Sequence, residues 1–268
     1  MHARCNDIDV AWFEAGRGDP LILLHGLGDD HRAWRRTLPD LMVRRRVLMY
    51  DLRGHGETSL GTADRTLRQL GDDLAALMDA LDLERADVAG FSLGGTIAMR
   101  LAIDHPDRVR GLALVATSSR VGRAAADWYR QRVEMVDRND PQLRETLDKD
   151  TADVYAESPA ELDEGLLIRR QSTEDPRGYG NACAAMAALN SSPLDPELPR
   201  IAAPTLIVAS DLDRHCPPRA AEIIAAGINA SATSQVKLEV LTGAGHPIPL
   251  EKPCELARSV NSFLAEIG

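Results

Sequence analysis

The 268-residue chain has few aromatic residues, four cysteines and no long apolar run. The cysteine spacing and the short apolar runs each exclude a class of protein. The longest wholly apolar stretch, 182–189, is eight residues, whereas about 18 are needed to cross a bilayer. The cysteines at 5, 183, 216 and 254 match neither a metal knuckle nor a redox motif. We therefore expect no membrane partner, no resident metal, and a reducing cytoplasm as the location.

Positive charge is also in deficit. The chain carries 31 Lys plus Arg against 41 Asp plus Glu, a net charge of −10, which argues against nucleic acid as a partner. Apolar residues make up 44% of the sequence, enough for a sizeable core. The length fits one large α/β domain, or one domain that carries an insertion. The sequence does not indicate an oligomeric state.

Short apolar segments alternate with longer amphipathic ones, a rhythm typical of a mostly parallel α/β sheet flanked by helices. The strand-like segments lack clean alternation, as expected when helices cover both faces of the sheet. We expect strands at 20–25, 47–51, 86–91, 111–116, 204–209 and 236–241, with an earlier strand at 9–14 hairpinned to residues 2–5. We expect helices at about 31–43, 64–82, 95–104, 219–226 and 252–266.

One long stretch, residues 118–198, breaks this rhythm because it contains helical patterns and no strand. A capping box with proline at the first helical position predicts that one of its helices starts at Ser158, and another is expected from 177 to 190. We interpret 118–198 as a helical cap over the active site. It would be inserted into an α/β core made of residues 1–117 and 199–268.

The strongest chemical signal is Gly90-Phe91-Ser92-Leu93-Gly94, which follows a predicted strand and opens a predicted helix. Strand, tight turn and helix form the setting of a nucleophile elbow, in which flanking glycines leave room where a Cβ would clash. The turn would lift the Ser92 hydroxyl clear of the sheet and place the Leu93 amide at a helix N-terminus. A glycine-rich turn with no chemical role is the alternative.

A serine hydroxyl needs a base, and a histidine base needs a carboxylate to orient it. Of seven histidines, His246 fits best, because it lies in a glycine loop just after the last predicted strand. His25 and His105 are better explained by loop bracing and by packing. Two carboxylates follow the strand at 204–209. We prefer Asp213, which stands further into the loop, and keep Asp211 in reserve.

An oxyanion requires two N–H donors, for which the candidates are the backbone amides of Leu93 and of Leu27 in His25-Gly26-Leu27-Gly28. The order Ser, Asp, His is the one expected on such a sheet. The chain lacks a paired-histidine zinc motif and the usual glycine-rich dinucleotide and phosphate loops. We therefore expect neither a metal nor an organic cofactor.

Together these segments resemble the α/β-hydrolase superfamily over essentially the whole chain. The resemblance includes Asp51-Leu52-Arg53-Gly54-His55-Gly56 and Gly243-Ala244-Gly245-His246, and it also selects Asp213 as the acid, although Ser210 replaces the family's usual glycine. It implies that Leu27 and Leu93 line an oxyanion hole. Within the superfamily the chain is most similar to the 3-oxoadipate enol-lactonase and carboxylesterase group, through 25–34, 51–56 and 178–201.

The resemblance implies a serine hydrolase that acts on a small ester or lactone through an acyl-enzyme. Two alternatives stay open: a C–C bond hydrolase of ring-cleavage products, and a hormone-receptor-like binding protein on the same fold. Four arginines near the start of the predicted cap allow two interpretations, a binding site for the carboxylate of an acidic lactone or a solvated helix surface. They are Arg120, Arg123, Arg130 and Arg132.

Overall fold

The computed structural model describes residues 1–230 and 235–268, and within them the strands form one eight-stranded sheet of order β1-β2-β4-β3-β5-β6-β7-β8. β1 and β2 form an antiparallel hairpin, β2 also pairs antiparallel with β4, and the remaining pairs are parallel. The strands are β1 His2–Cys5, β2 Ile8–Gly16, β3 Pro20–Leu24, β4 Arg46–Tyr50, β5 Ala86–Phe91, β6 Val109–Val115, β7 Thr205–Ser210 and β8 Val236–Leu241. The predicted strands are therefore confirmed, with ends shifted by one or two residues.

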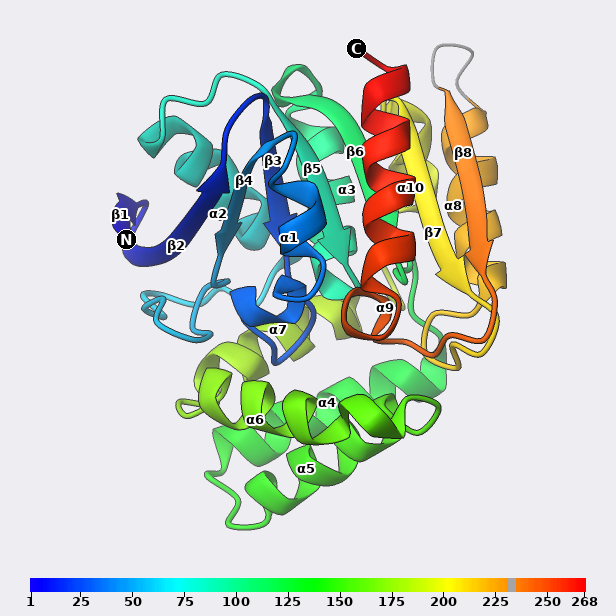
Figure 1. Ribbon diagram of the computed structural model, residues 1–268. Helices are drawn as coiled ribbons and strands as arrows, with labels where there is room; N and C mark the ends of the chain where they lie inside the picture. Colours follow the sequence, from blue (N-terminus) through cyan, green and yellow to red (C-terminus); the bar gives the residue numbers. More distant parts are fainter. Residues whose placement is uncertain (231–234) are drawn as a thin grey trace.

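Helices cover both faces of this sheet (Figure 1). On one face lie α2 (Leu67–Ala80), α3 (Leu93–Asp104) and α8 (Pro218–Asn229); on the other lie α1 (Leu38–Leu41) and α10 (Pro253–Glu266). Successive strand residues point to opposite faces, so Ile22 joins the α2–α3–α8 core while its neighbours in β3 join the α1–α10 core. This double burial explains the continuous apolar runs in the sequence.

The helices between β6 and β7 form a separate layer at the carboxyl ends of the parallel strands (Figure 1). They are α4 (Arg123–Asp137), α5 (Leu143–Val154), α6 (Leu162–Ser172) and α7 (Arg177–Ala188). α4 packs mainly on α7 and α5 mainly on α6. Tyr179 and Cys183 of α7 are completely buried in a small core of this layer.

Two predicted helices differ from the structure. The segment expected to be helical from 31 to 43 is a 3₁₀ turn, His31–Trp34, followed by the single turn α1. Pro39 explains the break, because a proline inside a helix lacks an N–H and clashes with the carbonyl four residues earlier. At 158, a 3₁₀ turn (Pro159–Glu161) precedes α6, and Ser158 caps neither of them, since its hydroxyl donates to Glu251 Oε2 at 2.5 Å.

The short helix α9 (Ile248–Glu251) and the 3₁₀ turns Pro106–Arg108 and Asp195–Arg200 complete the regular structure of the described ranges. No helix in those ranges combines the length and apolar character that a membrane span requires.

Candidate active site

Ser92 occupies a strained turn between β5 and α3. Its φ of 52° and ψ of −118° lie outside the regions that L-residues ordinarily adopt, and its amide donates to the Val115 carbonyl at 2.9 Å. The glycines on either side are required by space: a Cβ on Gly90 would stand 2.3 Å from the Gly94 carbonyl oxygen, and one on Gly94 would stand 2.5 Å from that of Leu24. The motif therefore has a steric basis, in agreement with its sequence context.

The structure brings Ser92, His246 and Asp213 into one hydrogen-bonded chain. His246 Nε2 lies 3.1 Å from Ser92 Oγ, and His246 Nδ1 lies 2.8 Å from Asp213 Oδ2. These residues come from the ends of β5, β8 and β7, so 154 residues of sequence separate the serine from the histidine. The three predicted side chains are thus adjacent at the carboxyl edge of the sheet.

Asp213 is held as a carboxylate. Its other oxygen, Oδ1, accepts the amides of His215 and Cys216, both at 2.8 Å, and its side chain is fully buried. Burial alone would raise the pKa of Asp213, but the charge and hydrogen bond of His246, with the two amides, hold that pKa below its ordinary value. The carboxylate therefore remains ionised and fixes which nitrogen of His246 carries the proton.

Asp211, the reserve candidate, lies elsewhere. Its Oδ1 accepts the amides of Gly243 and Ala244 at 2.8 and 3.3 Å, so it shapes the glycine loop that precedes His246. Ser210 acts on the same loop by donating to the Gly245 carbonyl at 2.6 Å. The serine that replaces the family's usual glycine thus positions the histidine loop.

The amides of Leu27 and Leu93 have no hydrogen-bond acceptor among the described residues. Leu93 is the first residue of α3, whose N-terminus favours a negative oxygen. Leu27 belongs to residues 26–29, which lie within the connection between β3 and the first 3₁₀ turn and are called the 26–29 loop below. Leu27 lines the cavity beside Ser92. Both amides are therefore available to a ligand.

Two buried histidines hold the 26–29 loop in place through hydrogen bonds. His25 Nε2 accepts the Leu52 amide at 2.9 Å, which agrees with the bracing role predicted for it. His55 Nε2 accepts the Gly28 amide at 3.4 Å, while its Nδ1–H donates to the Arg53 carbonyl. Burial, followed by repulsion from His25, lowers the pKa of His55 to about 3, so its ring stays neutral.

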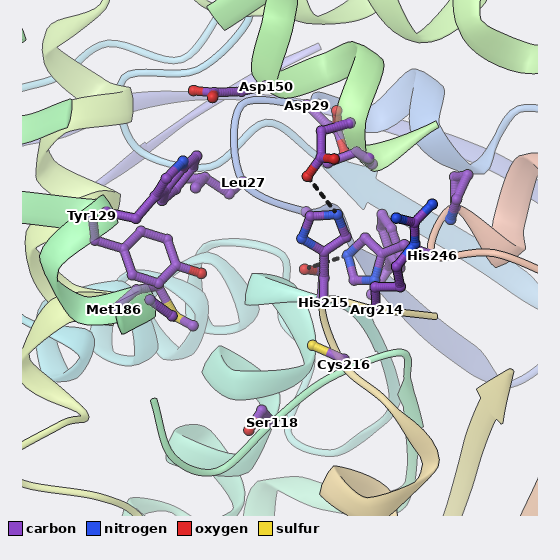
Figure 2. Close-up of a pocket in the computed structure, with 18 of the residues that line it drawn as sticks. Leu27, Asp29, Ser118, Tyr129, Asp150, Met186, Arg214, His215, Cys216 and His246 are labelled. Atoms are coloured by element: carbon purple, nitrogen blue, oxygen red, sulfur yellow. Dashed lines mark hydrogen bonds and ion pairs between the residues drawn. The ribbon is translucent and has the colours of Figure 1, made fainter. Parts of the chain in front are cut away.

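A cavity of roughly 400 Å³ opens between this edge of the sheet and helices α4 to α7. Ser92 and His246 stand in its wall beside the ring of Phe91, while Tyr129 and Met186 face them from α4 and α7 (Figure 2). The apolar part of the remaining lining includes Ala124, Ala125, Trp128, Val154, Tyr155 and Pro247, and polar and charged side chains make up the rest. A concave site that combines apolar and aromatic side chains with polar groups is typical of small-molecule binding.

Most of the charged groups in the cavity wall have oppositely charged partners. Asp29 pairs with Arg169 at 3.3 Å, Asp150 with Arg132 of α4 at 2.6 Å, and Arg214 with Glu157. Among the described residues, the charge partner of Asp153 is His215, at 3.6 Å. Burial and then the neighbouring His246 lower the pKa of His215, which leaves the charge of Asp153 unbalanced at neutral pH. The cavity is therefore slightly negative.

The four arginines near the start of the helical layer do not line the cavity. Arg120 pairs with Asp195, Arg130 pairs with Asp127 at 2.5 Å, and Arg123 is exposed. Arg132 stacks on the Trp128 ring, 4.5 Å from its centroid, while it pairs with Asp150. Of the two interpretations open for them, a helix surface with local ion pairs fits the structure.

Sequence reasoning missed Arg169, Tyr129 and His215, three polar residues of the cavity wall. Arg169 comes from α6 and carries no motif, and its contacts lie about 140 residues away in the chain. His215 does follow Asp213 closely, but beside Cys216 it forms only a two-residue pair, which predicts no site. Burial raises the pKa of the Cys216 thiol, so it is not a competing nucleophile.

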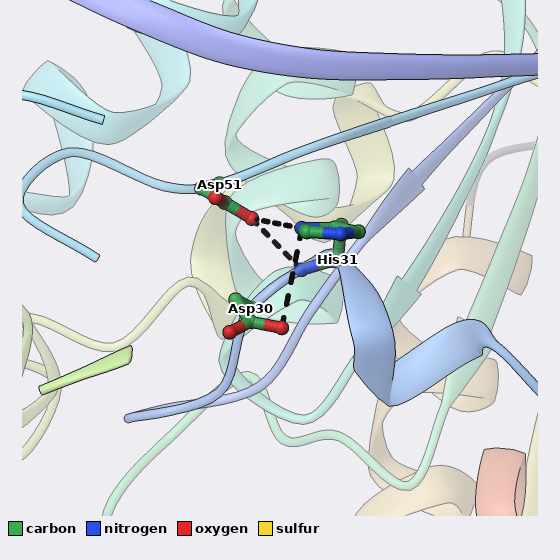
Figure 3. A group of neighbouring side chains, drawn as sticks. All are labelled: Asp30, His31 and Asp51. Atoms are coloured by element: carbon green, nitrogen blue, oxygen red, sulfur yellow. Dashed lines mark hydrogen bonds and ion pairs between the residues drawn. The ribbon is translucent and has the colours of Figure 1, made fainter. Parts of the chain in front are cut away.

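Asp30, His31 and Asp51 form a compact cluster whose geometry resembles a metal site (Figure 3). Their polar atoms already have partners. Asp51 accepts His31 Nδ1 at 2.8 Å and the Glu57 amide at 3.0 Å, while Asp30 caps the 3₁₀ turn and pairs with Arg32 at 2.5 Å. With these oxygens occupied by protein donors, the cluster serves to join the loops after β3 and β4.

A sequence profile described as the alpha/beta hydrolase fold matches residues 19–253. The chain belongs to the α/β-hydrolase family. Among curated relatives, 3-oxoadipate enol-lactonase 1 of Acinetobacter baylyi is 29% identical over 196 residues, which cover 72% of this chain and 71% of that protein. The chain spans only 33% and 48% of the lengths of two other curated relatives that it matches.

Solved structures of this α/β-hydrolase family are similar over nearly the full length. An enol-lactonase from Burkholderia xenovorans has a TM-score of 0.85 and 26% identity, covering 99% of this chain and all of that chain. A thermophilic esterase from Thermogutta terrifontis has a TM-score of 0.87 and 26% identity, with coverage of 100% and 98%. The family, the fold and the likeness to enol-lactonases anticipated from the motifs are confirmed.

Proposed function

We propose that the protein is a serine hydrolase that cleaves a carboxylic ester or lactone of a small molecule. The observation that carries this proposal is the continuous chain of hydrogen bonds from Ser92 through His246 to Asp213, with Ser92 and His246 in the wall of the cavity. The similarity to an enol-lactonase and an esterase of the same family supports the choice of substrate class.

In the proposed mechanism Ser92 Oγ attacks the substrate carbonyl carbon while His246 Nε2 removes the hydroxyl proton. Asp213 stabilises the imidazolium that results. His246 then gives the proton to the leaving alkoxide or enolate, which departs and leaves an acyl group on Ser92. Water, deprotonated by His246, attacks this acyl-enzyme, and His246 returns the proton to Ser92 Oγ as the C–O bond breaks and the acid is released. Water is the only co-reactant, so the cycle needs neither a metal nor an organic cofactor.

The amides of Leu27 and Leu93 would bind the oxyanion of each tetrahedral intermediate. Neither amide has an acceptor among the described residues, and that of Leu93 stands at a helix N-terminus, where negative charge is favoured. Losing one such donor typically costs on the order of 3 kcal/mol of transition-state stabilisation.

We further propose that residues 118–198 act as a cap on the core formed by 1–117 and 199–268. In support, all four helices line the cavity, and α4 and α7 contribute apolar side chains opposite Ser92, where the non-reacting part of a substrate would bind. We retain the cytoplasm as the proposed location. The four cysteines are free thiols, as a reducing compartment favours.

Hydrolysis of p-nitrophenyl butyrate by the wild type and by Ser92→Ala tests the proposal. We expect the substitution to lower kcat at least about 10³-fold, because it removes the nucleophile. Ser118→Ala is the matched control, since Ser118 also lines the cavity but donates to the Arg120 carbonyl; it should retain activity.

Three results would contradict the proposal. Equal activity of Ser92→Ala and the wild type would remove the serine from the mechanism. Turnover of a C–C substrate but of no ester or lactone would identify a C–C hydrolase. Tight ligand binding without turnover would identify a binding protein on the hydrolase fold.

A further inference from the structure

The C-terminal half of α6 is bonded to the 26–29 loop, although the two lie more than 140 residues apart in the chain. Arg169 Nη2 donates to the Leu27 carbonyl oxygen at 2.8 Å, and Ser172 Oγ donates to the Gly28 carbonyl oxygen. Both side chains are buried, with 7% and 3% of the residue surface exposed. Two successive carbonyls of the loop are thus bound by one helix of the cap.

The charge of Arg169 is also engaged with this loop. Its Nη2 lies 3.3 Å from Asp29 Oδ1, and Asp29 in turn closes the loop by donating its amide to the Gly26 carbonyl at 3.2 Å. Burial would lower the pKa of Arg169, but the negative charge of Asp29 outweighs this and the guanidinium stays protonated. Because the charge is compensated within the wall, Arg169 is not a free cation awaiting an anionic substrate.

Packing restricts the loop at the same place. Gly28 has a φ of +72°, and a Cβ there would stand 3.1 Å from Arg169 Nε and 3.2 Å from the ring of Tyr179. From the other side, the Gly56 amide donates to the Ser172 carbonyl at 3.0 Å. The loop therefore lies between α6 and α7 of the cap on one side and the core segment that contains His55 and Gly56 on the other.

We propose that Arg169 and Ser172 are positioning residues for the oxyanion hole: by holding the Leu27 and Gly28 carbonyls, α6 keeps the Leu27 amide aimed at the reacting carbonyl oxygen. The inference rests on the proposed serine hydrolase function. It makes the cap part of the catalytic machinery, because the oxyanion hole reaches its working geometry only when α6 is docked. Displacement by about 1 Å is enough to reduce a rate by roughly 100-fold in such sites.

The test compares Ser172→Ala, Arg169→Lys and the charge-balanced pair Arg169→Met with Asp29→Asn. Each is assayed for kcat and KM on p-nitrophenyl butyrate and for inhibition by an aliphatic trifluoromethyl ketone, whose adduct with serine places an oxyanion in the hole. We expect the double variant to lose about 10- to 100-fold in kcat and in inhibitor affinity together, with KM changed less than about twofold. Ser172→Ala should lose less, and Arg169→Lys should retain more activity than the double variant.

Arg36→Met is the matched control. Arg36 ties the beginning of α6 to the core by pairing with Glu164 at 2.6 Å and with Glu161, without touching the 26–29 loop. It should weaken the attachment of the beginning of α6, but because Arg169 and Ser172 still hold the 26–29 loop, inhibitor affinity should stay within about twofold of wild type. Thermal unfolding of all variants identifies any that do not fold, and Ser172→Ala remains the test if the double variant fails.

The inference is overturned if the Arg169 and Ser172 variants keep wild-type kcat and inhibitor affinity, or if they match Arg36→Met. It is also overturned if the loss appears only as a higher KM for an anionic ester, because Arg169 would then bind substrate. Wild type that neither hydrolyses the ester nor binds the ketone contradicts the proposed function itself. That outcome is distinct from a loss confined to the variants.

Discussion

At the scale of single residues, the site depends on strain that neighbouring glycines make possible. A residue held at the φ of Ser92 costs roughly 1 to 3 kcal/mol, which the rest of the fold must offset. Packing of the buried turn offsets this cost. At Gly90 and Gly94 the backbones of β5, α3 and β3 approach so closely that no Cβ would fit between them. Alanine at Gly90 should therefore prevent the turn from forming.

The two neighbouring aspartates give a sharp test of assignment at this scale. Asp213→Asn should lower kcat by on the order of 10³- to 10⁴-fold, because an amide cannot hold the same tautomer of His246 or stabilise its imidazolium. Asp211→Asn should cost less than about tenfold, since the Asp211 side chain bonds the amides of Gly243 and Ala244 and not His246. Steady-state kinetics on one ester suffices, and the opposite ranking would reassign the acid.

At this scale, the sequence reveals those site residues whose role depends on neighbours in the chain, and not those whose role depends on distant contacts. Ser92 and its glycines are recognisable because strand, turn and helix are contiguous, and Asp213 and His246 because each follows its own strand. Arg169 and Ser172 were not recognisable, because their partners are backbone carbonyls of the 26–29 loop. A carbonyl has the same chemistry in every residue, so no residue type marks such a contact in the sequence.

At the scale of elements, where a helix begins or ends depends on tertiary contacts, which the periodicity of apolar residues in the sequence does not reveal. Ser158 has the sequence of a cap, yet its hydroxyl bonds Glu251, whose same oxygen also accepts the Gly245 amide at 2.7 Å. The residue therefore links the loop before α6 to the histidine loop. A competing long-range partner replaced the local cap.

The helices around the cavity make a prediction about substrate charge. Asp153, near the end of α5, lies in the cavity wall, and within the described part of the chain its charge partner is His215, which is neutral at pH 7. Asp153→Asn should raise kcat/KM about threefold for the anionic ester mono-p-nitrophenyl succinate at low salt, and leave p-nitrophenyl butyrate unchanged. Glu145→Gln is the control, because it removes the same charge from the exposed beginning of α5.

If both substitutions change the anionic ester equally, the effect belongs to the net charge of the protein. If neither changes it, the charge of Asp153 is screened and the cavity does not select by charge.

At the scale of the whole molecule, the α/β class follows from the alternation of apolar runs and helical patterns. The order of strands does not, since it arises from crossovers between segments far apart in sequence. The layer of α4 to α7 was visible as a long stretch without strands. How α6 meets the 26–29 loop required the structure, because it depends on three-dimensional packing of separate elements.

Buried neutral His55 makes the stability of the whole fold depend on pH. Its pKa is about 3 in the folded protein, against 6.5 for an unperturbed histidine, so between these values the unfolded chain binds a proton that the folded chain does not. Stability should therefore fall as pH falls from about 6.5, by up to about 1.4 kcal/mol per pH unit from this group.

Urea unfolding at pH 7, 6 and 5 measures this dependence. His55→Gln should be less stable than wild type at pH 7 but should lose less stability on acidification. His2→Gln, at an exposed histidine of β1, should keep the wild-type slope. Equal slopes for all three proteins would show that His55 does not contribute.

The most direct test of the central claim, nucleophilic catalysis by Ser92, is covalent labelling with a fluorophosphonate followed by peptide mass spectrometry. The account predicts complete loss of esterase activity, one adduct per chain on the peptide containing Ser92, and much slower labelling of His246→Ala. An adduct on another residue, or an unlabelled Ser92 in a protein that still hydrolyses the ester, would contradict it.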